Sequence, residues 1–174
     1  MTTEKAKKSH KNAILQIGSD VFTPQDVVGL ELQLNHYLGC PASLRSVDRV
    51  DLETLKKLNG IVRQELFVFT LNKEIVGFSG LEISFFEGPS EVVWLNWTGI
   101  AQPFQGNGIG KSMMEYIGAR AKEAGYSHLG VKTCHVYGPA IALYEKNGFK
   151  YTGKMEHYFG KDEPLLVYMK DLQQ

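Results

Sequence analysis

Apolar positions along the chain follow a helical period at first and a strand-like period later. Residues 24–38 carry apolar side chains three and four apart, after Thr23 as a capping residue and Pro24 at the first helical position, which predicts a first helix. A weaker pattern predicts a second helix over 46–58. Beyond it, alternation predicts strands over 66–71, 75–86 and 92–100, with tight turns at 71–74 and 87–90.

The second half of the chain alternates helix and strand patterns. Residues 108–124 predict a helix, and its buried stripe would be Ile109, Met113, Ile117 and Ala121. A strand over 128–134, a short helix containing Tyr144, and strands at about 149–158 and 165–170 follow. This order predicts an α/β (α+β) domain with a mixed sheet covered by helices.

Composition narrows the class of protein. A chain of 174 residues with 43% hydrophobic content suits one domain, which we assign to 13–174, with 1–12 as a flexible, lysine-rich tail. Lys plus Arg and Asp plus Glu both number 19, so the net charge gives no attraction to nucleic acid. No apolar run approaches a membrane span or a signal peptide, so we expect a cytoplasmic protein.

Cysteine and histidine spacing indicates no metal site. Cys40 and Cys134 lie far apart without a Cys-x-x-Cys pair. The five histidines lack metal-binding spacing as well. We therefore expect two reduced cysteines and no bound metal.

The segment from Gln105 to Lys111 reads Gln-Gly-Asn-Gly-Ile-Gly-Lys and joins a strand to a helix. Glycines there let backbone N–H groups turn toward an anion beside the positive end of the helix, so the segment predicts a phosphate cradle. Asn107 is placed to cap the helix. A P-loop would need glycine at position 105, and a dinucleotide fingerprint would need glycine at 111 or 113. These positions hold Gln, Lys and Met.

The spacing Gln105-x-x-Gly108-x-Gly110 resembles the acyl-CoA loop of the GCN5-related N-acetyltransferase (GNAT) superfamily. Residues 140–149 look like that family's second signature, a short helix ending in Tyr-Glu-x-x-Gly-Phe. The resemblance covers roughly 65–172. It implies a mostly antiparallel sheet of six or seven strands with about four helices, and it implies transfer of an acetyl group from acetyl-CoA directly to a primary amine.

The resemblance also implies roles for individual residues. Thr98, Gly99 and Ile100 would present backbone groups to the pantetheine arm and the thioester, at a strand bulge that suits Gly99. The pyrophosphate would be bound by Gln105, Gly106, Asn107, Gly108, Ile109, Gly110 and Lys111. Tyr144 would protonate the departing thiolate. Gly148 would end its helix in the left-handed conformation.

Three positions depart from the family pattern. Lys132 stands where some members carry a glutamate, and Tyr137 and Gly138 stand where many carry an asparagine. The general base therefore stays open, with a water chain as one alternative to the side-chain candidates Glu82, Glu91, Glu156, His135 and His157. Covalent transfer through Cys134 is a weaker alternative to direct transfer.

The acceptor is the least specified partner. The hairpin 155–164, with Trp94, Asn96 and Trp97, mixes aromatic and charged groups and suggests an acceptor with an apolar or aromatic part beside its amine. A small molecule, an amino acid and a peptide or protein amine all remain open. A catalytically silent acyl-CoA-binding module is the alternative from another class. A homodimer is one option, which no residue requires.

Overall fold

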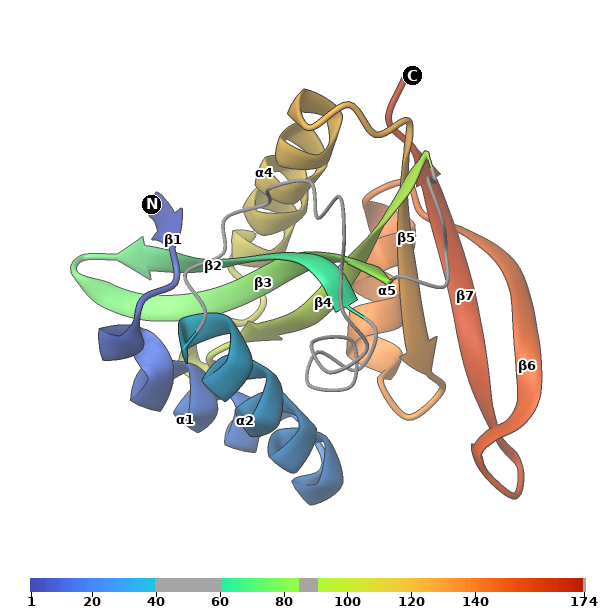
Figure 1. The fold of residues 1–174 in the computed structure, drawn as a ribbon, viewed down its shortest axis with the longest axis horizontal. Coiled ribbons are helices and arrows are strands. Elements are labelled where there is room, and N and C mark those ends of the chain that lie inside the picture. Colours follow the sequence, from blue (N-terminus) through green and yellow to red (C-terminus); the bar gives the residue numbers. More distant parts are fainter. Residues whose placement is uncertain (40–60, 85–90, 174) are drawn as a thin grey trace.

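One mixed sheet organises the described part of the chain, which comprises residues 1–39, 61–84 and 91–173 of the computed structural model (Figure 1). The N-terminal elements are β1 (Thr2–Lys5), the 3-10 turn η1 (Lys8–His10), α1 (Lys11–Val21) and α2 (Pro24–Gly39). The central elements are β2 (Ile61–Leu71), β3 (Glu74–Ser84), β4 (Val92–Ile100), the turn η3 (Gln102–Phe104) and α4 (Ile109–Glu123). The C-terminal elements are β5 (His128–Cys134), α5 (Gly138–Lys146), β6 (Lys150–Gly160) and β7 (Glu163–Asp171).

The sheet has the order β1-β2-β3-β4-β5-β7-β6. Its neighbouring strands pair antiparallel, except that β4 and β5 run parallel. With seven strands and four α-helices among the described residues, this is the mixed, mostly antiparallel sheet that the sequence predicted. The bounds of β4 and β5 are those predicted. The helix expected over 46–58, the end of the strand expected over 75–86, and the turn expected over 87–90 lie outside the described residues.

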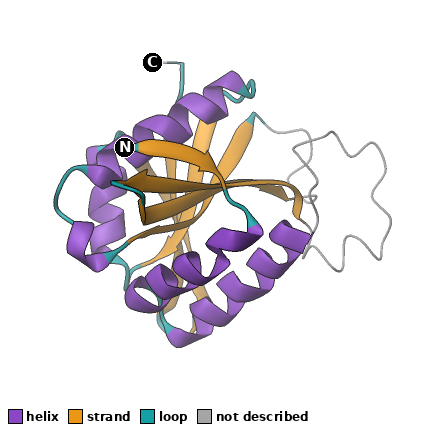
Figure 2. Cartoon of the chain, turned by 90° about the vertical axis from the view of Figure 1, so that its left-hand side faces the viewer, coloured by secondary structure: helices purple, strands orange, loops and turns teal. Residues whose placement is uncertain are grey.

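Helices cover both faces of the sheet (Figure 2). Alternate residues of β2 divide between the two layers, because successive side chains of a strand point to opposite faces. Leu66 and Val68 pack with residues of α1 and α2, whereas Phe67 and Phe69 pack with residues of α4 and α5. The helix α4 buries the predicted stripe, with Ile109 9% exposed and Met113, Ile117 and Ala121 fully buried. No described helix is both long and apolar enough to cross a membrane.

The N-terminal segment differs from the prediction. Residues 1–12, expected to be a flexible tail, instead include β1, which pairs antiparallel with β2 from Thr2 opposite Thr70 to Lys5 opposite Phe67. Ala6 is 9% exposed and donates its N–H to the Leu66 carbonyl at 2.8 Å. The helix α1, which follows, was not predicted either. It approaches α2 closely, since a Cβ on Gly18 would lie 2.6 Å from Leu30 Cδ2.

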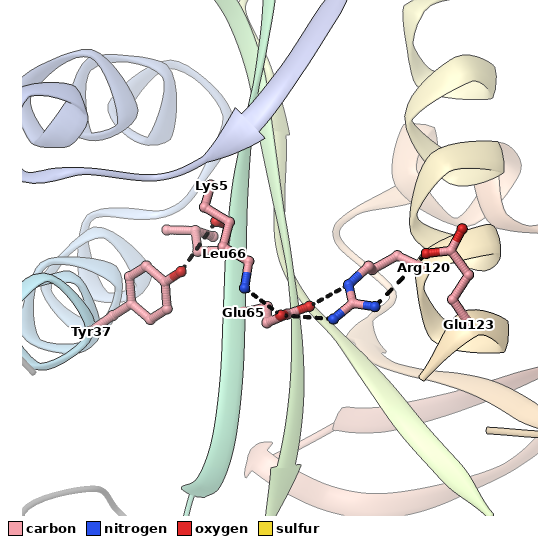
Figure 3. A network of polar contacts seen from close by, with 6 residues as sticks. All are labelled: Lys5, Tyr37, Glu65, Leu66, Arg120 and Glu123. Atoms are coloured by element: carbon pink, nitrogen blue, oxygen red, sulfur yellow. Dashed lines mark hydrogen bonds and ion pairs between the residues drawn. The ribbon is translucent and has the colours of Figure 1, made fainter. Parts of the chain in front are cut away.

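A buried carboxylate joins β1, β2 and α4 (Figure 3). Glu65 of β2 is 1% exposed, accepts hydrogen bonds from Arg120 Nε at 2.8 Å and Nη2 at 3.0 Å, and accepts one from Lys5 Nζ at 2.7 Å. Burial acts to raise the pKa of Glu65, but the hydrogen bonds and charges of Arg120 and Lys5 outweigh burial, so this pKa is lowered. The ion pairs thus fix the first strands to the helix that follows the glycine loop.

Candidate active site

The parallel pair β4 and β5 separates toward its carboxyl end. Pairing runs from Val92 opposite His128 to Leu95 opposite Val131. Beyond that point β4 stays with β3 as far as Ile100, and β5 stays with β7 as far as Cys134. The facing backbone edges of residues 96–100 and 132–134 therefore part from each other. A bound molecule can reach backbone groups at such a separation.

A bulge in β4 lies at the same place. Phe78 of β3 opposes Gly99, and Gly80 opposes Asn96, so β4 has one extra residue in this interval. Trp97 has a φ of 42°, within the left-handed region. A Cβ on Gly99 would lie 2.8 Å from Phe78 Cε1, so only glycine fits beside that ring. The bulge that the resemblance implied is therefore present, and packing against Phe78 requires glycine at position 99.

The glycine loop has the conformation that its composition predicted. Gly106 and Gly108 have φ values of 77° and 78°, and a Cβ on either would meet nothing within 4 Å. Both positions need glycine for the backbone conformation and leave one side of the loop open. The first bond into α4 runs from Ser112 N–H to the Gly108 carbonyl at 3.2 Å. The amides of 109–111 precede that bond and are not used by the helix.

Asn107 does not cap α4, contrary to the prediction. Gly108 is the N-cap residue, and Asn107 Nδ2 instead donates to the Gln105 carbonyl at 3.3 Å. The Gln105 side chain donates in turn to the Ile100 carbonyl at 2.9 Å. Lys111 is exposed and lies 3.8 Å from Glu115, so an ion pair on the helix surface accompanies this cation. The side chains of Gln105 and Asn107 thus hydrogen-bond to nearby backbone carbonyls.

Tyr144 is a buried residue of α5. It is 6% exposed, and its ring packs with Phe149 at a centroid distance of 5.6 Å. Burial raises the pKa of the Tyr144 hydroxyl to about 12, and a hydrogen bond with the Thr98 side chain acts in the opposite direction. Gly148 has a φ of 86°, as predicted for the end of the helix. The structure therefore brings Tyr144 to the bulged strand.

The candidate bases lie in different places. Glu82 hydrogen-bonds with Asn96, Glu91 accepts from Ser127 Oγ at 2.7 Å, and Glu156 pairs with Lys154 on β6. His157 Nδ1 accepts from the Asp162 amide at 3.1 Å, also on the β6–β7 hairpin. His135 directly follows β5 at its separated end, next to the buried Cys134. Among the residues that the structure describes, no group of three or more His, Cys, Asp or Glu could hold a metal ion.

Lys132, at the position where some members carry a glutamate, has an aromatic neighbour. Its Nζ lies 3.9 Å from the centroid of the Trp94 ring. A cation over an indole face is a favourable contact. The same ring fills the space beside Gly130, where a Cβ would lie 2.6 Å from Trp94 Cε3. Trp94 therefore contacts both Lys132 and the backbone at Gly130 on the neighbouring strand.

An aromatic group lies on the α1 and α2 side of the bulge. The Phe22 ring makes edge contacts with Trp97 at 5.5 Å and with Tyr137 at 6.1 Å between centroids. A surface hollow of about 270 Å³ beside it is lined by Ser19, Phe22, Pro24 and Val27. Sequence analysis named Trp97 as a candidate for the acceptor side but gave no role to Phe22.

Polar contacts tie the same helices to the strands. Asp26 accepts from Thr23 Oγ1 at 2.7 Å and also from the Tyr137 hydroxyl. Gln33 Oε1 accepts from Asn96 Nδ2 at 3.0 Å and from Trp97 Nε1. Tyr137 therefore has a hydrogen-bonded place in this structure, at a position where the family pattern carries asparagine.

Comparison with known proteins identifies the family of this chain. The family model of the acetyltransferase (GNAT) domain matches residues 63–151. A protein named IAA acetyltransferase, from Azospirillum brasilense, is 33% identical over 145 residues, which are 83% of this chain and 88% of that protein.

Solved structures share the fold. A crystal structure assigned to the GNAT family from Desulfovibrio desulfuricans has a TM-score of 0.78 at 12% identity, covering 98% of both chains. An aminoglycoside 6'-N-acetyltransferase complexed with coenzyme A has a TM-score of 0.67 at 14% identity, covering 99% of this chain and 97% of the other. The chain belongs to the GNAT acetyltransferase family.

Proposed function

We propose that this protein transfers an acetyl group from acetyl-CoA directly to a primary amine. The observation that carries the proposal is the meeting of three features at one end of the sheet. These are the separated edges of β4 and β5, the left-handed glycines before α4, and the buried Tyr144 against Thr98. Each supplies one requirement of acyl transfer: a place for the thioester, a place for the phosphates, and an acid.

The donor would be held mostly by backbone groups. The pyrophosphate would lie against the amides of the loop 105–111, where the positive end of α4 adds about 1 kcal/mol. The pantetheine arm would lie along Thr98, Gly99 and Ile100, at the edge that β5 leaves. A relative of the same fold has been solved with coenzyme A, which supports this type of ligand.

Tyr144 would serve as the acid. The acceptor nitrogen forms a bond to the acetyl carbon, the carbon–sulfur bond breaks, and the sulfur takes the hydroxyl proton of Tyr144. The phenolate is reprotonated from solvent, which also receives the proton that the amine loses. A hydroxyl with a pKa of about 12 is a weak acid beside a thiol, so the transfer depends on close placement.

The acceptor would approach from the α1 and α2 side. The hollow lined by Phe22 lies next to Trp97, where the bulge of β4 begins. Aromatic walls bind an apolar or aromatic part of a molecule. We therefore propose an acceptor that carries such a part beside its amine, and small molecules, amino acids and peptide amines all meet this description.

The test is turnover with a panel of amines. Wild-type protein is mixed with acetyl-CoA and each amine, and free thiol release and the mass of the product are measured. We expect an N-acetylated product. Tyr144→Phe should lower kcat while the affinity for acetyl-CoA stays nearly the same. Tyr151→Phe, at a half-exposed ring on β6, is the matched control and should change neither.

Two results would contradict the proposal. Failure to bind acetyl-CoA would exclude the donor. Binding of acetyl-CoA without transfer to any amine, and without an effect of Tyr144→Phe on any reaction, would favour the non-catalytic acyl-CoA-binding module.

A further inference from the structure

The ring of Phe22, at the corner between α1 and α2, contacts rings from both of the strands that separate. Its centroid lies 5.5 Å from that of Trp97, in the separated part of β4, and 6.1 Å from that of Tyr137, the third residue after β5. A further edge contact, at 6.3 Å, joins it to Phe78 of β3. Edge contacts between aromatic rings are favourable. Phe22 therefore lies on the α1 and α2 face of the sheet, at the place where β4 and β5 part.

The helix α1 covers the same face beside Phe22. A Cβ on Gly99 would lie 3.3 Å from Ile17 Cγ2, and Ile17 is 4% exposed. The separated part of β4 is thus covered by α1 at Gly99 and by Phe22 at Trp97. Phe22 itself is only partly buried and lines the surface hollow of about 270 Å³. It therefore stands between this hollow and the separated edges of β4 and β5.

Tyr137 holds the corner that carries Phe22. The Tyr137 hydroxyl donates to the Asp26 carboxylate and accepts a hydrogen bond from the Thr23 amide at 3.4 Å. Asp26 also accepts from Thr23 Oγ1 at 2.7 Å, and its own amide donates to that oxygen at 3.3 Å. A tyrosine hydroxyl has one proton to donate, and here that proton joins the segment after β5 to the first turn of α2. Because Phe22 directly precedes Thr23, this link restrains the position of its ring.

A ring held at this point limits the shape of the acceptor near its nitrogen. The amine must pass Phe22 to reach a thioester bound at the separated edges, whereas the rest of the acceptor can stay in the hollow. A CH2 group next to the nitrogen fits beside a fixed ring more easily than a branched carbon does. In an apolar site of fixed shape, one additional carbon changes kcat/KM about tenfold or more.

We propose that Phe22 is a specificity-determining residue that restricts the acceptor to primary amines on an unbranched CH2 carbon, with Tyr137 as the positioning residue that holds it. This inference rests on the proposed function. It favours amines such as a lysine side chain or an arylalkyl amine. It disfavours the α-amino groups of most amino acids and peptides, because these groups stand on a branched carbon.

The experiment compares two acceptors, benzylamine and 1-phenylethylamine, the second as each enantiomer. They differ only by a methyl group on the carbon that bears the amine. We expect wild type to favour benzylamine in kcat/KM by roughly tenfold or more, and Phe22→Leu to reduce this preference to about threefold or less. Tyr137→Phe removes the hydroxyl, keeps the ring and should reduce the preference in the same way. KM for acetyl-CoA should stay within about twofold in both variants.

Matched variants separate this role from a general loss of stability. Asp26→Asn keeps an oxygen that can accept from the Tyr137 hydroxyl and should keep the preference, whereas Asp26→Ala should lose it. Tyr116→Leu removes a partly buried ring on α4 that contacts Phe67 and Phe69, and it should lower the melting temperature without changing the preference. Because both acceptors are compared within each variant, a loss of active protein cancels in the ratio. Tyr137→Phe keeps the test open if Phe22→Leu does not fold.

The results distinguish this inference from the proposed function. Equal kcat/KM for the two acceptors in wild type would overturn the inference, and so would a preference that both Phe22→Leu and Tyr137→Phe leave unchanged. Acetylation of an amine in either case leaves the proposed function standing. If neither of these two acceptors is acetylated although another amine is, the inference falls alone. If no amine is acetylated, the proposed function fails and the inference fails with it.

Discussion

Leu143 occupies the space in which a side chain at Gly110 would stand: a Cβ on Gly110 would lie 2.8 Å from Leu143 Cδ1. Ile100 Cδ1 would lie 3.1 Å from the same Cβ. The third glycine of the loop therefore serves packing, whereas Gly106 and Gly108 serve backbone conformation. Because Leu143 directly precedes Tyr144, the contact between Gly110 and Leu143 links the start of α4 to the helix that carries the proposed acid.

The first prediction concerns that contact. Gly110→Ala should destabilise the protein by about 1–3 kcal/mol, the usual cost of overpacking, and should lower kcat because α5 must shift. Gly118→Ala, also within α4, is the matched control. A Cβ there would meet only Leu172 Cδ2 at 3.8 Å, so we expect little change in stability. Thermal unfolding and turnover measure both. Equal stability of Gly110→Ala and wild type would contradict the packing role.

The second prediction concerns acid stability. The lowered pKa of Glu65 means that its contribution is present at pH values above the unfolded pKa of about 4.3 and is lost as pH falls through the folded pKa. Glu65→Gln should therefore be less stable than wild type at neutral pH, and the difference should shrink as the solution is acidified. Denaturant unfolding from pH 7 downward measures this dependence.

A second variant tests the ion pairs of Glu65 by removing one of its partners. Arg120→Leu leaves a buried carboxylate with only Lys5 as a cation partner in the hydrogen bonds described, so we expect a loss of about 3 kcal/mol. Glu4→Gln removes an exposed pair with Lys7 and is the control, with little expected change. A constant difference between Glu65→Gln and wild type at all pH values would contradict the pKa shift.

The third prediction concerns the basic limb of the pH–rate profile. Tyr144, with a pKa of about 12, should stay protonated and able to donate through about pH 10. Turnover should therefore rise with pH as the amine loses its proton, and it should show no fall up to about pH 10. A fall in kcat centred near pH 8–9 that disappears in Tyr144→Phe would contradict a buried, protonated tyrosine.

Much of this fold is visible in the sequence because its central elements have strong periods. The strand β4 is an apolar run, and α4 repeats an apolar residue every four positions, so both were predicted closely. The edge strand β1 was missed because it has four residues, mostly exposed, and no apolar alternation. The helix α1 buries only Ile14, Ile17 and Gly18, a stripe too short to stand out.

Some residues of the candidate site could likewise be predicted from the sequence, and others could not. The glycine loop and Tyr144 stand in motifs with fixed spacing, so the sequence indicates them. The bulge beside Gly99 was expected from the resemblance. The left-handed backbone at Trp97 could not be predicted, because tryptophan seldom adopts a positive φ. The prediction that Asn107 caps α4 was wrong. Its residue type favours capping, but the left-handed Gly108 takes the capping position.

Calorimetric titration of acetyl-CoA into wild type, Gly108→Val and Gly125→Val tests whether the glycine loop binds the donor. Both glycines have left-handed φ values and open space around a Cβ, so the backbone strain is similar, but Gly125 follows the far end of α4. We expect micromolar binding to wild type and Gly125→Val and roughly tenfold or weaker binding to Gly108→Val. Equal affinity in all three, or binding of ATP but not acetyl-CoA, would contradict the proposed acetyl-CoA site at the glycine loop.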